Sequence, residues 1–199
     1  MSGPGYGRVS VVERWDVEPL QRSRRGLDER LLMAAPWLLR LQWALLVGLR
    51  PGSQLRRALI GHVVRVGVAA NNRGDYEALV AFMSSEIELH VYPDAPELRP
   101  LDAADPIYHG REGYVNASKV LKAGLGNFRW EVRELVDPGG DRFGARTERV
   151  GRGSRSGVEV RDTEFEVWQV RHGLLRHQWT LSTEAAMLEL LERKRVAPR

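Results

Sequence analysis

The stretch that decides the fold runs from Asn72 to Val91 and reads NRGDYEALVAFMSSEIELHV. Gly74 is expected to end one helix, because glycine readily adopts the left-handed conformation that closes a helix C-terminus. Asp75 then stands at the N-cap of a short amphipathic helix, and a strand with alternating polar residues follows over residues 86–92. The stretch therefore predicts a helix, a second helix and a strand in close succession.

Two further helices are expected upstream. Asp28 could cap the first, which runs to about Leu49, and Ser53 is placed to cap the second, which reaches the turn at Gly74. Residues 1–26 are rich in Gly, Arg and Ser and show little periodicity, so they are expected to be flexible. The second helix carries an apolar stripe made of Leu55, Leu59, Ile60, Val63, Val64 and Val68.

Downstream, a loop rich in Pro, Asp and Ala covers residues 93–106, and a helix is expected from Arg111 to Leu125. Alternation then predicts a meander of four strands, closed by a last helix from Thr183 to Lys194. Helices first and an antiparallel meander last give an α+β layer fold. The strands are expected over residues 128–136, 142–150, 158–170 and 174–181.

This order of elements, with the segment YHGREG at residues 108–113 before the meander, resembles the SnoaL-like branch of the NTF2-like superfamily. The resemblance covers roughly residues 60–190. It implies an NTF2-like cone, in which a curved, mostly antiparallel sheet wraps around N-terminal helices and encloses a conical pocket. Many superfamily members pair through their sheets, so the resemblance also implies a homodimer.

Four segments follow from this comparison. Residues 1–26 form a flexible Arg/Gly-rich N-terminus, and residues 27–59 form a helical extension that is both basic and apolar. Residues 60–194 form the SnoaL-like domain, and residues 195–199 form a tail.

Composition excludes several kinds of site and partner. The chain has 199 residues and no cysteine, so a disulfide framework, a thiolate nucleophile and a cysteine metal site are excluded. The balance of 30 Lys+Arg against 26 Asp+Glu is only mildly basic, and no nucleic-acid-binding motif is present, so no nucleic-acid partner is expected. Residues 1–7 lack the apolar region of a signal peptide. These features predict a cytoplasmic protein.

The segment from Leu31 to Leu49 raises the question of membrane contact. It is strongly apolar, but Arg40 near its centre argues against a spanning helix. No acidic residue occurs from Leu31 through Gly74, whereas six arginines do, so weak contact of residues 31–73 with a membrane surface is one alternative. The other is a helix packed on the domain or in a dimer, with its arginines lying along the protein surface.

Strand alternation predicts which side chains face the pocket. Two acids and two histidines are expected beside several aromatic side chains at one cavity, which is the pattern of a small-molecule site. Of the three tryptophans in the meander, one is expected to touch the cavity. The predicted site consists of Glu88, Tyr92, Tyr108, Trp130, Glu164, Trp168, His177 and Trp179, together with His90 and Glu166 as candidate catalytic residues.

The two candidate catalytic residues come from a further resemblance. Ketosteroid isomerases share the superfamily fold and carry a general-base carboxylate at the end of the first strand, an acid on a later strand and a helix tyrosine. The resemblance places His90 at or next to the base position and Glu166 at the acid position. Gly67 matches the tyrosine and cannot donate a hydrogen bond, so that mechanism is not carried over whole. For His90 the alternative is a structural histidine. For Glu166 the alternatives are a salt bridge to a neighbouring arginine such as Arg146, or an outward-facing position if the strand carries a bulge.

No cofactor and no metal are expected. The five histidines show no pair at helical ligand spacing. The glycines at residues 151 and 153 join two strands and do not open a helix, so they do not form a phosphate-binding loop.

Three hypotheses on function remain. The first is a protein that binds a small apolar molecule in a conical pocket. The second is an enzyme such as a cyclase, isomerase or dehydratase that uses His90 and Glu166 in proton transfer. The third is a homodimeric interaction module with a vestigial pocket, which predicts a filled core and an exposed apolar patch.

Overall fold

The computed structural model describes residues 12–95, 107–123, 125–153 and 157–193. Its described residues form one seven-stranded sheet with the strand order β1-β4-β5-β6-β7-β2-β3. Only β2 and β7 pair in parallel, and the other neighbours are antiparallel. The strands are β1 Glu13–Asp16, β2 Met83–Val91, β3 Ile107–His109, β4 Leu125–Asp137, β5 Arg142–Gly153, β6 Glu159–Arg171 and β7 Leu174–Leu181.

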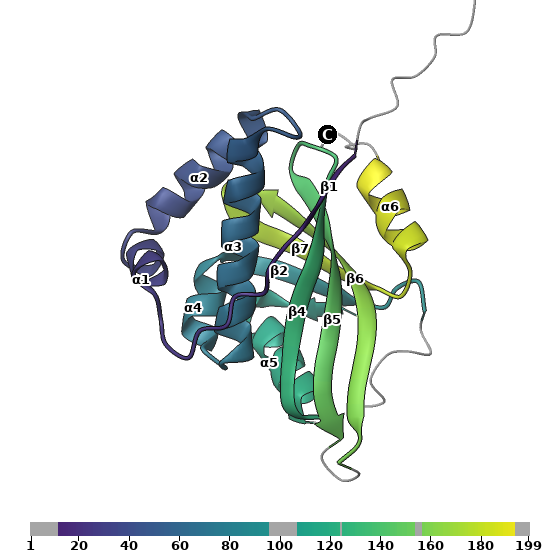
Figure 1. The fold of residues 1–199 in the computed structure, drawn as a ribbon. Coiled ribbons are helices and arrows are strands. Elements are labelled where there is room, and N and C mark those ends of the chain that lie inside the picture. The colour runs from purple at the N-terminus through teal and green to yellow at the C-terminus, as the bar shows by residue number, and fades with distance from the viewer. Residues whose placement is uncertain (1–11, 96–106, 124, 154–156, 194–199) are drawn as a thin grey trace, which may run out of the picture.

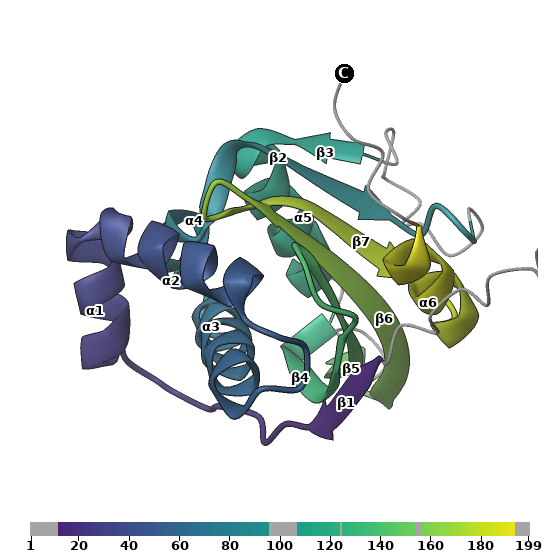
Figure 2. The same ribbon diagram turned by 90° about the horizontal axis from the view of Figure 1, so that it is seen from above.

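Helices cover both faces of this sheet (Figures 1 and 2). The long helix α3 runs along the concave face, with α2 beside it, whereas α6 lies on the opposite face. The predicted α+β architecture, a curved and mostly antiparallel sheet around N-terminal helices, is confirmed. The helices are α1 Leu27–Ala34, α2 Pro36–Gly48, α3 Gln54–Asn72, α4 Tyr76–Ala81, α5 Gly110–Ala123 and α6 Glu184–Glu192.

Local capping explains where several helices begin. The Ser53 hydroxyl accepts a hydrogen bond from the Arg56 N–H, and the Asp75 carboxylate accepts one from the Ala78 N–H. Both N-caps were predicted. The expected cap at Asp28 is wrong: α1 begins after Gly26, and the Asp28 carboxylate instead binds Arg22.

Three other expectations about the N-terminal part need correction. Residues 13–16, expected to be flexible, form β1, which adds to the edge of the sheet beside β4. The single helix expected up to Leu49 is two helices that meet at Ala35, because Pro36 cannot donate the backbone hydrogen bond of a helix interior. The expected segment boundary between residues 59 and 60 falls inside α3. Residues 1–11 and 194–199 lie outside the described part of the chain.

A buried ion pair joins α2, α3 and the β4–β5 turn. Arg56 is fully buried and binds Asp137 through two bonds, Nε to Oδ2 at 2.6 Å and Nη2 to Oδ1 at 2.8 Å. Its guanidinium also donates to the carbonyls of Leu46 and Gly140. Because Leu46 belongs to α2 and Asp137 ends β4, the Arg56 side chain ties α2 to the sheet.

A second polar network fixes the segment before α1. Arg25 binds the Asp75 carboxylate through two bonds at 2.6 and 2.7 Å. The buried carboxylate of Glu29 accepts hydrogen bonds from the Gly26 N–H and from Arg73. The capping residue of α4 is therefore also the anchor of the N-terminal segment.

Candidate functional site

A cavity of about 110 Å³ lies between the concave face of the sheet and the helices. Its lining is mostly aliphatic and aromatic and comes from α2, α3, α4, α5 and five strands, β2, β4, β5, β6 and β7. The polar and charged members of the lining are Asn71, Tyr92, Tyr114, Ser118, Thr147, Arg149, Glu164, Glu166, Gln178 and Thr180.

Glu164 lies in the cavity lining, and both of its carboxylate oxygens have hydrogen-bond partners. Its carboxylate accepts hydrogen bonds from the indole Nε1 of Trp130 at 2.8 Å and from the hydroxyl of Tyr92 at 3.1 Å. The Nε of Arg149 lies 3.3 Å from Oε2. Burial raises the pKa of Glu164, whereas Arg149 and the two donors act to lower it.

Glu166, two residues further along β6, has a different environment. It is buried, with 6% of its surface exposed, and its described partner is the Gln178 amide, whose Nε2 lies 3.4 Å from Oε1. Burial, and then the neighbouring Glu164, raise the pKa of Glu166 well above its usual range. This shift favours the protonated form of Glu166, and a protonated carboxyl can donate one hydrogen bond.

The Gln178 side chain links Glu166 to helix α5. The Tyr114 hydroxyl donates to Gln178 Oε1 at 2.7 Å, and this orients the amide so that its NH₂ group points toward Glu166. Tyr114 is fully buried, and burial raises its pKa, so its proton stays in place. A tyrosine, an amide and an acid thus form one chain across the cavity.

Three lining residues each have a buried polar atom without a hydrogen-bond partner in the described structure. They are the indole Nε1 of Trp43, the amide Oδ1 of Asn71 and the hydroxyl of Thr147. A buried polar group without a partner costs free energy, and such groups are rare in folded proteins. Unpaired donors and acceptors at a cavity indicate a place where a bound molecule can supply the partner.

Aromatic rings line the cavity next to α2. The rings of Trp43 and Phe143 stack with centroids 5.6 Å apart, and Phe143 lies 5.4 Å from Trp168. The N-terminal extension therefore contributes Trp43 directly to the cavity. The cavity is narrowed by Trp43 and Trp168 but not filled by them.

The structure divides the ten predicted site residues into two groups. Two of the three meander tryptophans touch the cavity, where one was expected. The residues in the lining are Tyr92, Trp130, Glu164, Glu166 and Trp168, and those outside it are Glu88, His90, Tyr108, His177 and Trp179.

The facing of β2 was predicted wrongly, and Tyr92 is the reason. Leu89 and Val91 line the cavity, so His90 between them faces the other side. Tyr92 has a φ of 43°, the left-handed conformation, which breaks the alternation and returns its side chain to the cavity. Because the prediction placed His90 on the same face as Tyr92, it assigned the side chains of β2 to the wrong faces of the sheet.

The same inversion holds for β7. Gln178 and Thr180 line the cavity, and they alternate with His177 and Trp179. Leu181, which shares the outer face, is buried against α6. Because helices cover both faces of the sheet, a buried aromatic on a strand does not by itself tell which face is the cavity face.

His90, His177, Trp179 and Glu88 instead form a cluster on the outer face. The ring of His90 stacks on that of Trp179 at 5.3 Å, and its Nε2 lies 3.1 Å from Glu88 Oε2. His177 Nε2 lies 3.6 Å from the same oxygen, and burial lowers the pKa of His177. Tyr108 belongs to β3, at the edge of the sheet, and packs beside β2 and α5. Among the described residues, no group of His, Cys, Asp or Glu could hold a metal ion.

Sequence reasoning missed several lining residues, in particular Trp43, Tyr114, Arg149 and Gln178. The alternation of Trp130 with charged neighbours correctly predicted that Trp130 faces inward. Arg149 and Gln178, in contrast, look like solvent-facing polar residues on their strands. Arg146, the arginine expected to pair with Glu166, has Glu134 as its partner across β4 and β5 in the sheet register. Arg149 pairs with two other acids of β6, Asp162 and Glu164.

No family model matches this chain, and no curated protein matches it. Solved structures do match. TerC, co-crystallised with polyporic acid, is 19% identical with a TM-score of 0.52, over 66% of this chain and 96% of TerC. An NTF2-like protein of unknown function from Burkholderia pseudomallei is 15% identical with a TM-score of 0.52, over 66% of this chain and 95% of its own.

A third match is a hypothetical protein from Catenulispora acidiphila, with a ketosteroid isomerase-like fold and in complex with trimethylamine. It is 12% identical with a TM-score of 0.50, over 64% of this chain and 89% of its own. At these identities the matches show the fold alone. The chain has the NTF2-like fold, as the resemblance in its sequence implied.

Proposed function

We propose that this NTF2-like chain binds a small, mainly apolar molecule that carries a hydrogen-bond acceptor such as a carbonyl oxygen. The observation that carries the proposal is the position of Glu166, a buried carboxyl in the lining of an apolar cavity whose described hydrogen-bond partner is the Gln178 amide at 3.4 Å. Its raised pKa favours the protonated form, which can donate a hydrogen bond. A buried donor without a good acceptor is costly, and a ligand acceptor would satisfy it.

The lining sets the size and character of this ligand. A cavity of about 110 Å³ is smaller than an engineered apolar cavity of ~150 Å³ that holds benzene, so it limits the enclosed part of a ligand to about one ring. The stacked rings of Trp43 and Phe143 offer flat apolar surface. The unpaired groups of Asn71 and Thr147 add an acceptor and a hydroxyl elsewhere in the same lining. Together they favour an aromatic or alicyclic ligand with one or two polar substituents.

Two fold relatives support a small-molecule role at the level of the fold. TerC was crystallised with polyporic acid, and the Catenulispora acidiphila protein with trimethylamine. Function on a shared fold depends on the particular site, so neither compound is proposed for this chain.

Binding is favoured over the enzymatic hypothesis by the position of the candidate base. His90 and Glu166 lie on opposite faces of the sheet and do not meet one molecule in this cavity. Glu164 is the other lining carboxylate, but its oxygens already accept from Trp130 and Tyr92. The vestigial-pocket hypothesis predicts a filled core, whereas the cavity is open to a ligand. The homodimer stays a prediction.

The test compares two ligands of similar shape, acetophenone and isopropylbenzene, by calorimetric titration. Acetophenone has a carbonyl and isopropylbenzene does not. The wild-type protein is expected to bind acetophenone more tightly than isopropylbenzene. Glu166→Leu is expected to lower the affinity for acetophenone by about 3- to 10-fold, which corresponds to the loss of one hydrogen bond. Isopropylbenzene is the matched control, because Glu166→Leu should not lower the affinity for this ligand. Equal loss for both ligands, or no binding of either, would contradict the proposal.

A further inference from the structure

Helix α2 is apolar on two opposite faces. Leu39, Trp43 and Leu46 recur at four- and three-residue spacing and are buried, with Trp43 at the cavity. On the opposite side Trp37, Leu41 and Leu45 form an i, i+4, i+8 stripe. A helix that is apolar all round is expected to be buried on all sides, yet this one is covered on one side only.

Helix α1, which packs beside α2, adds further exposed apolar side chains to this stripe. Ten large apolar side chains are exposed in the described part of the chain, and six of them lie within residues 27–48. Trp37 is 63% exposed, and Leu27 and Leu31 of α1 are 78% and 60% exposed. We use the name α1–α2 surface for Leu27, Leu31, Trp37, Leu41 and Leu45.

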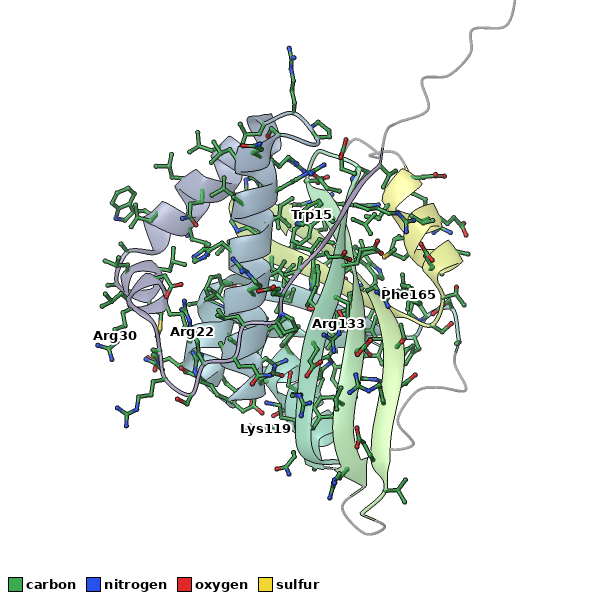
Figure 3. The ribbon with its side chains drawn as sticks, in the orientation of Figure 1. Trp15, Arg22, Arg30, Lys119, Arg133 and Phe165 are labelled. Carbon is green, nitrogen blue, oxygen red and sulfur yellow. The ribbon has the colours of Figure 1, made fainter. Side chains whose placement is uncertain are left out.

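The charge around the α1–α2 surface has one sign. Arg30, Arg40 and Arg50 are exposed and form no salt bridge within the described residues. Figure 3 shows Arg30 on α1, directed away from the body of the molecule. No acidic residue occurs in residues 31–74. The two carboxylates of α1 are already engaged, Asp28 with Arg22 and Glu29 with Arg73.

The geometry suits contact with a membrane surface. Within the described residues no single helix is long and apolar enough to cross a membrane; α1 and α2 pass that test only as a pair, and they are bent by 100° where they meet. At 13 residues α2 is roughly 20 Å long, less than the ~30 Å of a bilayer core. Leucines and a tryptophan flanked by arginines are the composition of helices that lie in the membrane interface.

We infer that the α1–α2 surface docks on an anionic phospholipid bilayer, with its leucines and Trp37 in the interface and its arginines on the phosphate groups. A second copy of this chain fits less well. In a twofold contact the same unpaired arginines would face each other, and like charges across an interface are unfavourable. An anionic surface instead attracts them.

Docking would place the bilayer one helix away from the cavity, because α2 carries Leu41 outward and Trp43 inward. This consequence rests on the proposed function. An apolar ligand could then pass between lipid and cavity by displacement of a single helix.

The test is sedimentation of the full chain with vesicles, at about 0.1 M salt where charge attraction is still felt. Vesicles of equal phosphatidylcholine and phosphatidylglycerol should bind the protein, and vesicles of phosphatidylcholine alone should bind it much less. Leu41→Glu is expected to lower the partition coefficient by at least about tenfold. Arg40→Glu should lower it by about fivefold or more. The matched control is Val120→Glu on α5, at a residue exposed to 44% compared with 49% for Leu41, and it should bind as wild type does.

Several outcomes would overturn the inference. Equal binding to both kinds of vesicle, or equal loss in Leu41→Glu and Val120→Glu, would show that the α1–α2 surface does not recognise anionic lipid. A wild-type dimer that Leu41→Glu converts to a monomer, without vesicle binding, would assign the surface to self-association. Acetophenone titration of Leu41→Glu keeps the two proposals separate, because the cavity should bind equally well in this variant.

Discussion

Glu164 and Glu166 lie two residues apart on the same face of β6, yet one has three strong partners and the other has one weak partner. The Glu164 carboxylate accepts hydrogen bonds from Trp130 Nε1 at 2.8 Å and from the Tyr92 hydroxyl at 3.1 Å, and Arg149 Nε lies 3.3 Å from it. Glu166 has the Gln178 amide at 3.4 Å. The two acids therefore differ in how far their hydrogen-bonding capacity is used, and Glu166 is the one with capacity left for a ligand.

The raised pKa of Glu166 makes stability depend on pH. Above the ordinary pKa of about 4.5 the unfolded chain loses a proton that the folded chain keeps, so the free energy of unfolding falls as pH rises. The slope is up to about 1.4 kcal/mol per pH unit until the folded-state pKa is reached. Glu166→Gln removes this term, so its stability relative to wild type should increase from pH 4 to pH 7 in urea titrations. A constant difference over that range would mean that Glu166 is ionised in the folded protein.

His177, on the outer face of the sheet, should make stability depend on pH with the opposite sign. Burial lowers the pKa of His177, so below the ordinary value of about 6.5 the unfolded chain binds a proton that the folded chain does not. Stability should therefore fall as pH drops through the range just below 6.5, and His177→Gln should flatten that part of the curve. The NMR titration of the His177 ring measures the pKa directly. A midpoint above 6.5 would contradict the burial argument.

Arg56 should be one of the side chains most important to stability. Removal of one partner from a buried pair leaves the other charge uncompensated, so Arg56→Met is expected to cost about 3–5 kcal/mol in urea unfolding. Its neighbour Arg57 makes a half-exposed ion pair with Glu13, and Arg57→Met should cost less than about 1 kcal/mol. The double variant Arg56→Met/Asp137→Leu should recover part of the loss. Similar costs for the two single variants would show that the buried pair has no special role.

Gly67 offers a way to fill the cavity. It lies on α3 in the lining, and a Cβ added there would meet no atom within 4 Å. Gly67→Ala should stabilise the protein by up to about 1 kcal/mol through helix propensity alone. In Gly67→Leu the new side chain should in addition occupy the cavity, and the affinities for acetophenone and isopropylbenzene should fall alike.

The matched control for Gly67 is Gly61, on the same helix and with equally open space, but outside the cavity lining. Gly61→Leu should leave both affinities unchanged. If Gly67→Leu also leaves them unchanged, the ligands bind somewhere other than this cavity.

Local features were read correctly from the sequence where a short-range cause was enough. The caps at Ser53 and Asp75 depend on a side chain and a backbone three residues away, and both are present. The strand at residues 174–181 is bounded by its own turn, and its limits agree with β7. Alternation along β6 placed Glu164, Glu166 and Trp168 on one face, and all three line the cavity.

Other features depend on partners far away in the chain. β1 has little pattern of its own and becomes a strand because β4 presents an open edge. Trp43, Tyr114 and Arg149 reach the cavity from three elements that only the fold brings together. Their side chains carry no local sign of that role.

The sequence by itself determined the order of the elements and most of their limits, because periodicity and capping are local properties. The resemblance of that order to the SnoaL-like branch implied the NTF2-like fold. The tertiary structure decided which face of β2 and β7 encloses the cavity. A one-residue change of phase moves every side chain to the other face, and here the left-handed Tyr92 changes the phase where β2 ends. That backbone angle brings Tyr92 into the cavity, whereas His90 alternates with Leu89 and Val91 and faces outward; Glu166 stays in the site.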